Sequence, residues 1–249
     1  MRYEKAKQLF IEYLEEHDKT QKKIKLKEEH TFRVVDISEQ LATALSLDEK
    51  DIELAKTIAL LHDIGRFDQA KLFDNFKDSE TFDHAEYAVE LLKNKKILEQ
   101  SAFDQEEINI VLIAIKNHNK YKIENNLKEK ELLHTNIVRD ADKIDILKIV
   151  VGEDLNQTSK KEIGTMTDKV LTDFLNSKSV NYIHLKTRLD IYLNRLAFAF
   201  DINYKWSLIY IRNKGYMDML MEKMRKENAD TKERIDLVEN HIKDYLNQA

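Results

Sequence analysis

The sequence predicts an all-α protein, and three features of its 249 residues point to that class. Proline is absent and glycine occurs only 4 times, whereas sheet-rich proteins need both residues for their turns. Charged residues make up 35% of the chain, mostly lysine and glutamate, which suits solvated helix faces. Hydrophobic residues, at 42%, are enough for a core in a chain of this length. We therefore expect long helices joined by short polar loops.

Apolar residues that recur at intervals of three and four predict the helices one after another. A short amphipathic helix at 3–16 comes first. A lysine-rich stretch at 19–27 follows, which we interpret as a solvated lead-in rather than an anion-binding patch. The second helix, at 26–46, carries His30 on its inward-facing stripe. That stripe consists of Leu26, His30, Val34, Ile37, Leu41 and Leu45.

Acidic residues that serve as N-caps mark the next helix starts. Asp48 precedes a helix at 49–63, Gly65 is expected to end it, and 66–81 is predicted to be an irregular loop. Two further caps, Asp83 and Asp104, begin helices that hold one histidine each near an end. These and the later helices are predicted at 83–93, 104–118, 129–151, 163–177, 180–203, 205–224 and 229–247.

Aromatic residues gather in the segment 180–216. Core packing is the expected role, because aromatic side chains dominate core burial. A ligand-pocket wall and a subunit interface are the alternatives, and homodimerisation is left open.

Charge and composition exclude several classes of function. The formal net charge of −5 argues against general nucleic-acid binding, although a local basic site for a phosphate remains compatible with it. Cysteine is absent, so any metal site must use His, Asp and Glu. The charged N-terminus does not resemble a signal peptide and the apolar stretches are too short to span a bilayer, so we expect a cytoplasmic protein without a membrane partner.

Six residues of the metal-ligand type lie in or at the ends of predicted helices. Burying a histidine or an aspartate without a partner is costly, and a divalent cation would remove that cost. Adjacent residues on a helix point about 100° apart, but at a helix end two neighbours can converge on one ion. Positions left open for water are typical of catalytic sites. The six are His30, the pair His62-Asp63, His84, His118 and Asp142.

The ordered set resembles the HD superfamily of metal-dependent phosphohydrolases. The strings that carry the resemblance are Leu61-His62-Asp63-Ile64-Gly65-Arg66, Ala141-Asp142-Lys143 and His30-Thr31-Phe32-Arg33-Val34. His84 and His118 resemble the additional histidines of two-metal members, and the resemblance covers roughly residues 25–150. It implies a single helical HD-type core at 25–151, preceded by an N-terminal helix at 1–24 and followed by a helical extension at 152–249 that packs on the core.

The resemblance implies a metal-dependent phosphohydrolase that cleaves the phosphoester of a nucleotide or nucleotide-like substrate with a metal-activated water. Asp63, Arg66 and Lys143 are the expected catalytic residues, with Arg66, Arg33 and Asp145 expected to bind substrate. One or two ions of manganese, iron, cobalt, nickel or zinc are expected, with magnesium disfavoured where imidazoles dominate. The absence of proline argues against the cyclic-dinucleotide branch, so small nucleotides or dinucleoside polyphosphates fit better. The alternatives are a non-catalytic metal- or nucleotide-binding regulator and a di-iron oxygenase.

Several histidines also have interpretations that involve no metal ion. His84 could be an exposed first-turn residue, and His118 could be placed by the helix macrodipole. His17 and His134 do not belong to the set of six ligand residues and are predicted at the surface. His184 is expected in the core or at the surface.

Overall fold

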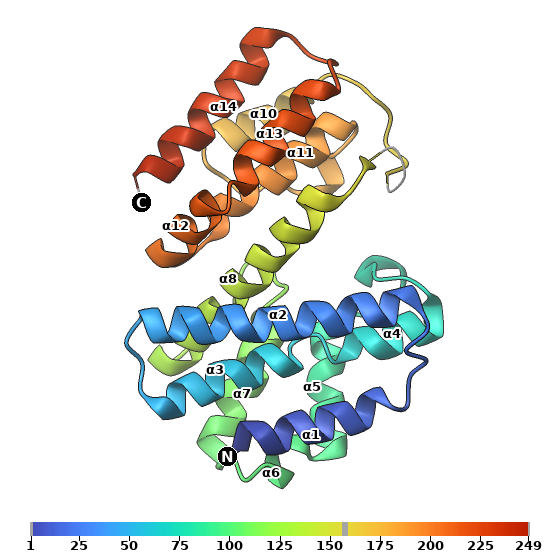
Figure 1. The fold of residues 1–249 in the computed structure, drawn as a ribbon, viewed down its shortest axis with the longest axis vertical. Helices are drawn as coiled ribbons and strands as arrows, with labels where there is room; N and C mark the ends of the chain where they lie inside the picture. The colour runs from blue at the N-terminus through green and yellow to red at the C-terminus, as the bar shows by residue number, and fades with distance from the viewer. Residues whose placement is uncertain (1, 156–158, 249) are drawn as a thin grey trace. The chain divides into compact units, whose positions relative to one another are not determined.

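The structure, a computed structural model, describes residues 2–155 and 159–248, and every regular element in these residues is a helix. The predicted all-α class is therefore confirmed. The chain divides into two compact units, Met1–Asp142 and Lys143–Ala249, and the division falls within one long helix, α8 (Glu129–Gly152) (Figure 1). This helix carries the last of the predicted metal ligands.

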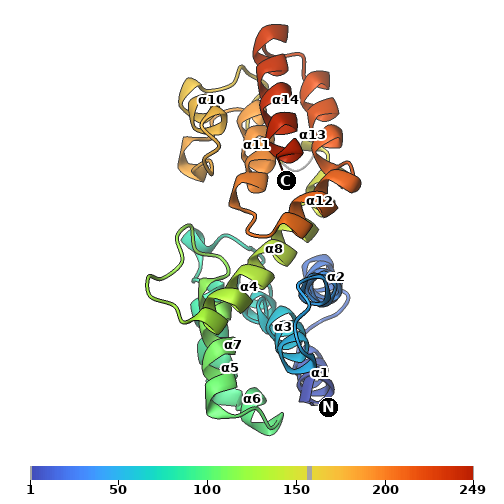
Figure 2. The ribbon, with the colours of Figure 1, turned by 90° about the vertical axis from the view of Figure 1, so that its left-hand side faces the viewer.

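The first unit is a two-layered helical bundle. Figure 2 shows α1, α2 and α3 on one side and α5, α6 and α7 on the other, with α2 packed along α3 and α3 against α7. Its interior is closed by fully buried side chains such as Phe10 and Phe67, whose rings meet edge to face at 5.8 Å. The helices before α8 are α1 (Arg2–Leu14), α2 (Lys22–Ala44), α3 (Glu49–Leu61), α4 (Gly65–Phe73), the 3-10 helix η1 (Asp78–Glu80), α5 (His84–Lys95), α6 (Ile97–Gln100) and α7 (Gln105–Asn117).

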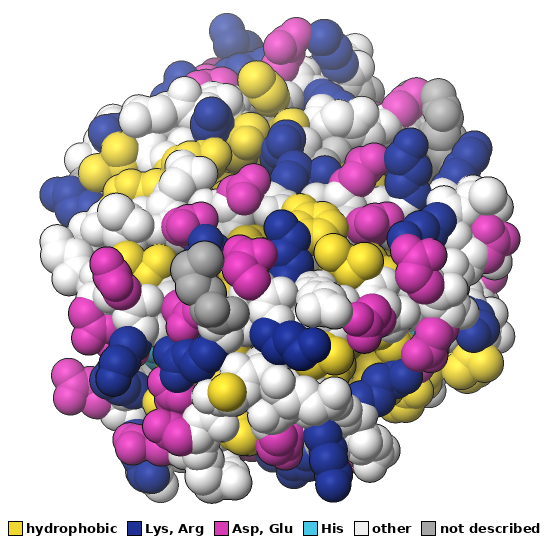
Figure 3. Space-filling view, turned by 60° about the horizontal axis from the view of Figure 1, so that its bottom comes forward, with side chains coloured by type: hydrophobic (Ala, Val, Ile, Leu, Met, Phe, Trp, Pro, Cys, Tyr) yellow, Lys and Arg dark blue, Asp and Glu magenta, His cyan; other side chains and the backbone are white. Residues whose placement is uncertain are grey.

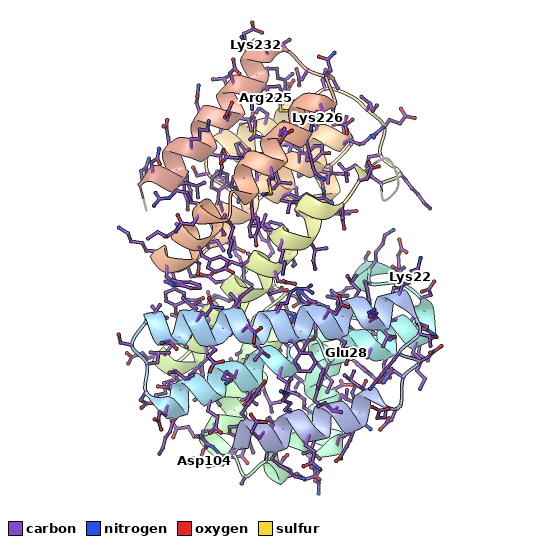
Figure 4. The ribbon with its side chains drawn as sticks, viewed as in Figure 1. Lys22, Glu28, Asp104, Arg225, Lys226 and Lys232 are labelled. Carbon is purple, nitrogen blue, oxygen red and sulfur yellow. The ribbon has the colours of Figure 1, made fainter. Side chains whose placement is uncertain are left out.

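Three predicted N-caps start the helices that position the site. The carboxylates of Asp48 and Asp83 accept hydrogen bonds from first-turn amides of α3 and α5. Asp104, labelled at the start of α7 in Figure 4, forms a reciprocal capping box with Glu107. These caps fix where each helix begins, and so fix which face their histidines take.

Two predictions for the first unit are wrong. The segment expected to be a loop after Gly65 contains the helix α4, because the chain makes only a short turn before Gly65 and then re-enters a helix. Leu26, expected on the buried stripe of α2, is 41% exposed. Helix α2 begins at Lys22 and not at 26, so Leu26 is one turn inside the helix and lies beside its solvated face.

The second unit is also helical, but its helices are shorter than predicted. The expected helix at 180–203 is interrupted by an extended stretch at 185–187, where Thr187 begins a new helix with a capping box to Asp190. The expected helix at 205–224 breaks at Gly215, whose φ of 68° is left-handed. The elements are α10 (Asp168–Leu175), η2 (Tyr182–His184), α11 (Arg188–Leu196), η3 (Ala197–Asp201), α12 (Lys205–Asn213), α13 (Tyr216–Lys226) and α14 (Lys232–Asn247).

The aromatic residues of this unit are less buried than expected. Tyr192 and Tyr216 are buried, whereas Tyr182 is 68% exposed and Phe198, Phe200, Tyr204, Trp206 and Tyr210 are half-buried. Core packing therefore accounts for only some of these aromatic residues.

The face drawn in Figure 3 mingles acidic and basic side chains and shows no broad field of one sign. None of the described helices combines the length and the apolar character that crossing a membrane requires.

Candidate metal centre

Five helices of the first unit supply the six predicted ligand residues. His30 lies in the middle of α2, and His84 is the first residue of α5. The pair His62-Asp63 occupies the short turn between α3 and α4, in which His62 keeps right-handed helical backbone angles. His118 follows α7 as its C-cap, and Asp142 lies on α8 at the end of the first unit. The structure brings all six together in overlapping groups whose ligand atoms lie within 4.8 Å of one another.

The first group joins two histidines to two carboxylates. His30 Nε2 lies 3.2 Å from Asp142 Oδ1 and 3.6 Å from Asp63 Oδ2. His62 Nε2 lies 3.6 Å from the same Asp63 oxygen and 3.8 Å from Asp142 Oδ1. Two imidazole nitrogens and two carboxylate oxygens thus face one point. Asp142 is the most exposed of the four, at 16% of its side chain, so it marks the side of this group nearest solvent.

The second group forms around the other oxygen of Asp63. His84 Nε2 lies 3.2 Å from Asp63 Oδ1, and His118 Nε2 lies 3.7 Å from it. The two ring nitrogens are 3.0 Å apart. Asp63 therefore offers one oxygen to each group, as a carboxylate that bridges two ions would.

Backbone carbonyls fix the tautomers of two of these histidines. His62 Nδ1 lies 2.7 Å from the carbonyl oxygen of Ala59, and His118 Nδ1 lies 2.7 Å from that of Ile115. A carbonyl oxygen only accepts hydrogen bonds, so Nδ1 carries the proton in both rings and Nε2 presents a lone pair. Among the described residues His62 Nε2 is buried and has no hydrogen-bond partner. A cation is the group that satisfies such a nitrogen between two carboxylates.

Asp78 orients the remaining histidine of the second group. Its Oδ2 lies 2.7 Å from His84 Nδ1, so the carboxylate accepts the Nδ1 proton and leaves Nε2 directed at Asp63. Burial would raise the pKa of Asp78, but the hydrogen bond from His84 and the charge of Arg66 outweigh it, so the pKa lies below its usual value. An ionised carboxylate behind a ligating imidazole is a common arrangement in metal sites.

The electrostatics of the cluster suit coordination. Burial would raise the pKa of the Asp63 carboxyl, but the Lys27 ammonium and His62 outweigh burial and hold it well below its usual value. Burial likewise opposes ionisation of Asp142, and the hydrogen bond from His30 lowers its pKa. Burial lowers the pKa of His62 to about 4. At neutral pH the carboxylates are therefore ionised and His62 is neutral, which are the states that bind a metal.

The donor set fits divalent transition metals. Ligand bonds of about 2.1 Å place donor atoms up to about 4.2 Å apart, close to the spacing within each group. Imidazole with carboxylate suits manganese, iron, cobalt, nickel and zinc better than magnesium. The groups of ligand atoms that lie within 4.8 Å of one another offer three protein donors each, and six-coordinate ions would keep positions for water or substrate.

Gly65 lets α4 approach the second group. A Cβ atom at this position would lie 2.5 Å from the carbonyl oxygen of His84 and 3.2 Å from Tyr87 Cδ1. The glycine that we expected to stop a helix instead begins α4 and allows close contact with the first turn of α5.

Arg66, expected to bind phosphate, lies beside the cluster but is already engaged. Its Nη1 donates to Gln69 Oε1 at 2.6 Å, to the carbonyl oxygen of Phe76 at 2.6 Å and to Asp78 Oδ1 at 2.7 Å. Its Nε lies 3.6 Å from Asp63 Oδ1. The guanidinium thus ties the segment before η1 to the cluster.

Lys27 is a cation at the cluster that we did not predict. Its Nζ lies 2.5 Å from Asp63 Oδ2 and 5.4 Å from the centroid of the Phe76 ring. The interpretation of 19–27 as a solvated lead-in is therefore wrong at this residue. The sequence feature that could have indicated its place at the cluster is its position one helical turn before His30, which puts both residues on one face of α2.

Buried Arg139 holds the turn that carries His118. Its Nη1 donates to the carbonyl oxygens of Asn117 at 3.0 Å, His118 at 3.1 Å and Lys120 at 2.7 Å. These carbonyls lie at the C-terminal end of α7, where helices lack internal donors. Nothing in the sequence pattern singled out Arg139 or Asp78 for these roles.

The other predicted catalytic and substrate-binding residues have these positions. Arg33 lies on α2, with its Nη1 3.9 Å from Glu29 Oε2. Lys143 and Asp145 fall in the second unit, where Lys143 Nζ is 2.9 Å from Asp201 Oδ2 and Asp145 is buried. Their proposed roles stay predictions.

The prediction that His17 and His134 lie at the surface is wrong. Both are buried because each is paired with a carboxylate: His17 Nε2 lies 3.0 Å from Asp68 Oδ1, and His134 Nε2 lies 3.2 Å from Asp51 Oδ1. His84 and His118 are buried as well, so the interpretation of His84 as an exposed residue does not hold.

Comparison with known proteins finds a family match for residues 28–147. The model of the HD domain family matches residues 28–147, a range that contains all six ligand residues. Neither the curated proteins nor the solved structures include a match to this chain.

Proposed function

We propose, from the membership of residues 28–147 in the HD domain family and from the geometry of the cluster, that the protein is a metal-dependent phosphohydrolase. The HD domain carries a His/Asp cluster with the donors for a divalent metal. The proposed reaction is hydrolysis of a phosphoester in a nucleotide or a similar small molecule.

One observation carries the proposal: Asp63 directs one oxygen at the nitrogens of His30 and His62 and the other at those of His84 and His118. A carboxylate shared in this way supports two adjacent ions. Divalent ions at such a site supply a water of lowered pKa and neutralise the charge of a phosphoryl group.

The chain's own residues would prepare that chemistry. Ala59 and Ile115 hold the rings of His62 and His118 with Nε2 deprotonated, so no proton must leave before a ligand binds. Asp78 orients the His84 ring in the same way, but although burial lowers the pKa of His84, its hydrogen bonds to Asp63 and Asp78 raise it above the usual value, so a metal ion would compete with a proton on His84 Nε2. Because these partners are fixed by helix ends and by the half-buried carboxylate of Asp78, the donors need little rearrangement.

The proposed substrate class rests on the cations at the cluster. Lys27 and Arg66 both lie within 6 Å of the Phe76 ring and next to Asp63, so positive charge is concentrated where a phosphate would meet the ligands. Phosphate esters of small nucleotides fit this charge, and the net charge of −5 disfavours polymeric nucleic acid.

Metal content of the purified protein tests the proposal directly. We expect up to two ions per chain by elemental mass spectrometry, falling toward one in His118→Ala. His184→Ala is the matched control, since His184 belongs to none of the ligand groups found among the described residues. Phosphate release from nucleoside monophosphates and dinucleoside polyphosphates, with manganese or iron added, is then measured for the same three proteins.

The outcomes separate the alternatives. Metal-dependent phosphate release that His118→Ala abolishes and His184→Ala retains supports the phosphohydrolase. Two irons with oxygen consumption and no phosphate release would indicate an oxygenase. Bound metal without turnover of any kind would indicate a regulator, and an absence of metal after reloading would refute the proposal.

A further inference from the structure

We propose that Lys27 is the phosphate-binding residue of this site and that it is released from Asp63 for that role when a metal ion binds. The inference rests on the proposed function and adds a residue to it. It concerns the part of the cluster that faces α2, where the ammonium group and the first ligand group share one carboxylate oxygen.

Lys27 is held against the ligands in the structure. Its Nζ lies 2.5 Å from Asp63 Oδ2, the same oxygen that lies 3.6 Å from both His30 Nε2 and His62 Nε2. The Lys27 side chain is 17% exposed and that of Asp63 is 4% exposed, so the ion pair is only weakly screened by solvent. The Phe76 ring, 5.4 Å from Nζ, contributes a cation–π contact on this side.

A divalent ion in the first group would break this ion pair. The ion needs Asp63 Oδ2 together with His30 and His62, and it would place two positive charges next to the ammonium. Like charges at such short range repel strongly in a buried site. Lys27 has a flexible four-carbon stem, so its ammonium can move while its helix stays in place.

The displaced ammonium needs a new anion, and a phosphoryl group is the anion that this site would receive. A phosphate that approaches the ions carries several negative oxygens, and the ammonium group of a neighbouring lysine can donate a hydrogen bond to one of them. Lys27 would therefore exchange one oxygen of Asp63 for one oxygen of the substrate.

Arg66 is less free to take this role. Its Nη1 is shared among Gln69 Oε1, the Phe76 carbonyl and Asp78 Oδ1, and withdrawing it would release the segment that carries Asp78. Asp63, by contrast, is the single anionic partner that the described residues provide for Lys27. The structure thus distinguishes an arginine that holds the site together from a lysine that can leave its partner.

The test measures two affinities of Lys27→Met, which keeps the length of the aliphatic stem and removes the charge. Manganese binding is titrated first, and binding of inorganic phosphate to the manganese-loaded protein is then measured by calorimetry. We expect manganese to bind Lys27→Met as tightly as the wild type or more tightly, because a competitor for Asp63 is gone. Phosphate should bind at least about tenfold more weakly, as expected for loss of a charge-assisted hydrogen bond.

Two further variants make the result specific. Lys25→Met removes a lysine of the same helix whose side chain is 70% exposed, and it should leave both affinities unchanged. Lys27→Arg keeps the positive charge and should recover most of the phosphate affinity. Phosphate affinity within about twofold of the wild type in Lys27→Met would overturn the inference.

Weaker manganese binding in Lys27→Met would also overturn the inference, because Lys27 would then support Asp63 rather than compete with the ion. If manganese binds to the wild type and only the phosphate result fails, the proposed function stands and Lys27 is excluded. A wild-type protein that binds no ion overturns both, since nothing would then displace the ammonium.

Discussion

Replacing Gly65 with alanine should damage the second ligand group through the backbone of His84. The new Cβ would lie 2.5 Å from the carbonyl oxygen of His84, whereas real Cβ contacts essentially never fall below 3.0 Å. The two helices must therefore separate by at least 0.5 Å, and by 0.9 Å to reach an ordinary contact at 3.4 Å. The neighbouring atom is backbone, so rotating a side chain cannot relieve the clash. His84, the first residue of α5, would move with it.

The energetic cost follows from two opposing terms. Overpacking of this kind costs about 1–3 kcal/mol, and the better helix propensity of alanine returns about 1 kcal/mol. We expect a net loss of up to roughly 2 kcal/mol in the free energy of unfolding. Urea unfolding followed by circular dichroism, with chelator present so that metal does not contribute, measures this loss. The affinity for the second ion should fall about tenfold or more, because His84 Nε2 is displaced from Asp63.

Gly152→Ala is the matched control, since a Cβ there would meet nothing within 4 Å. It should leave metal binding unchanged and stability unchanged or raised by up to about 1 kcal/mol. A Gly65→Ala protein as stable as the wild type, with both ions bound normally, would refute the argument that close packing of α4 on α5 sets the position of His84.

Two further predictions concern carboxylates that accept hydrogen bonds from buried histidines. Asp78→Ala removes the carboxylate that accepts a hydrogen bond from His84 Nδ1 and that pairs with Arg66. The affinity for the second ion should therefore fall about 10–100-fold while the first ion is retained. Equal loss of both ions would contradict the division into two groups. Asp68 has its pKa lowered to about 2, chiefly by the hydrogen bond from His17, so its folded pKa lies below the unfolded value of about 3.9. The stability that Asp68 contributes is therefore present above pH 4 and lost as the pH falls toward 2. Asp68→Asn should lower the free energy of unfolding at pH 7 by about 1 kcal/mol, allowing for solvent screening. Between pH 4 and pH 2 the free energy of unfolding of this variant should change less steeply with pH than that of the wild type. An unchanged pH dependence in this range would show that Asp68 is not the group responsible.

Helical periodicity and N-caps placed individual ligand residues on a helix face or at a helix end. His30 was placed inward because it recurs with Val34 and Leu41 on a stripe of threes and fours, and both of these neighbours are fully buried. Asp83 caps α5 as predicted, which puts His84 at the first position of that helix. A pattern of period 3.6 fixes a face and a cap fixes an end, but it was the resemblance to the HD family that grouped the six residues into one site. Their roles as ligands remain predictions.

Local patterns failed where a residue's role depends on a distant partner. Gly65 was interpreted as a helix stop, although its function is to let α4 approach the backbone of His84, which only the packing of two helices reveals. The burial of His17 depends on Asp68, which lies 51 positions away in the sequence. Gly215 divides a predicted helix because its backbone is left-handed. A glycine within an amphipathic segment does not by itself indicate that conformation.

The position of the His62-Asp63 pair explains why adjacent residues can serve two groups. Adjacent side chains on a helix point about 100° apart, so His62 and Asp63 approach the cluster from different directions. His62, the C-cap of α3, keeps right-handed helical backbone angles, and the Ala59 carbonyl anchors its ring. Asp63 is then free to lie between the two sets of histidines with one oxygen toward each.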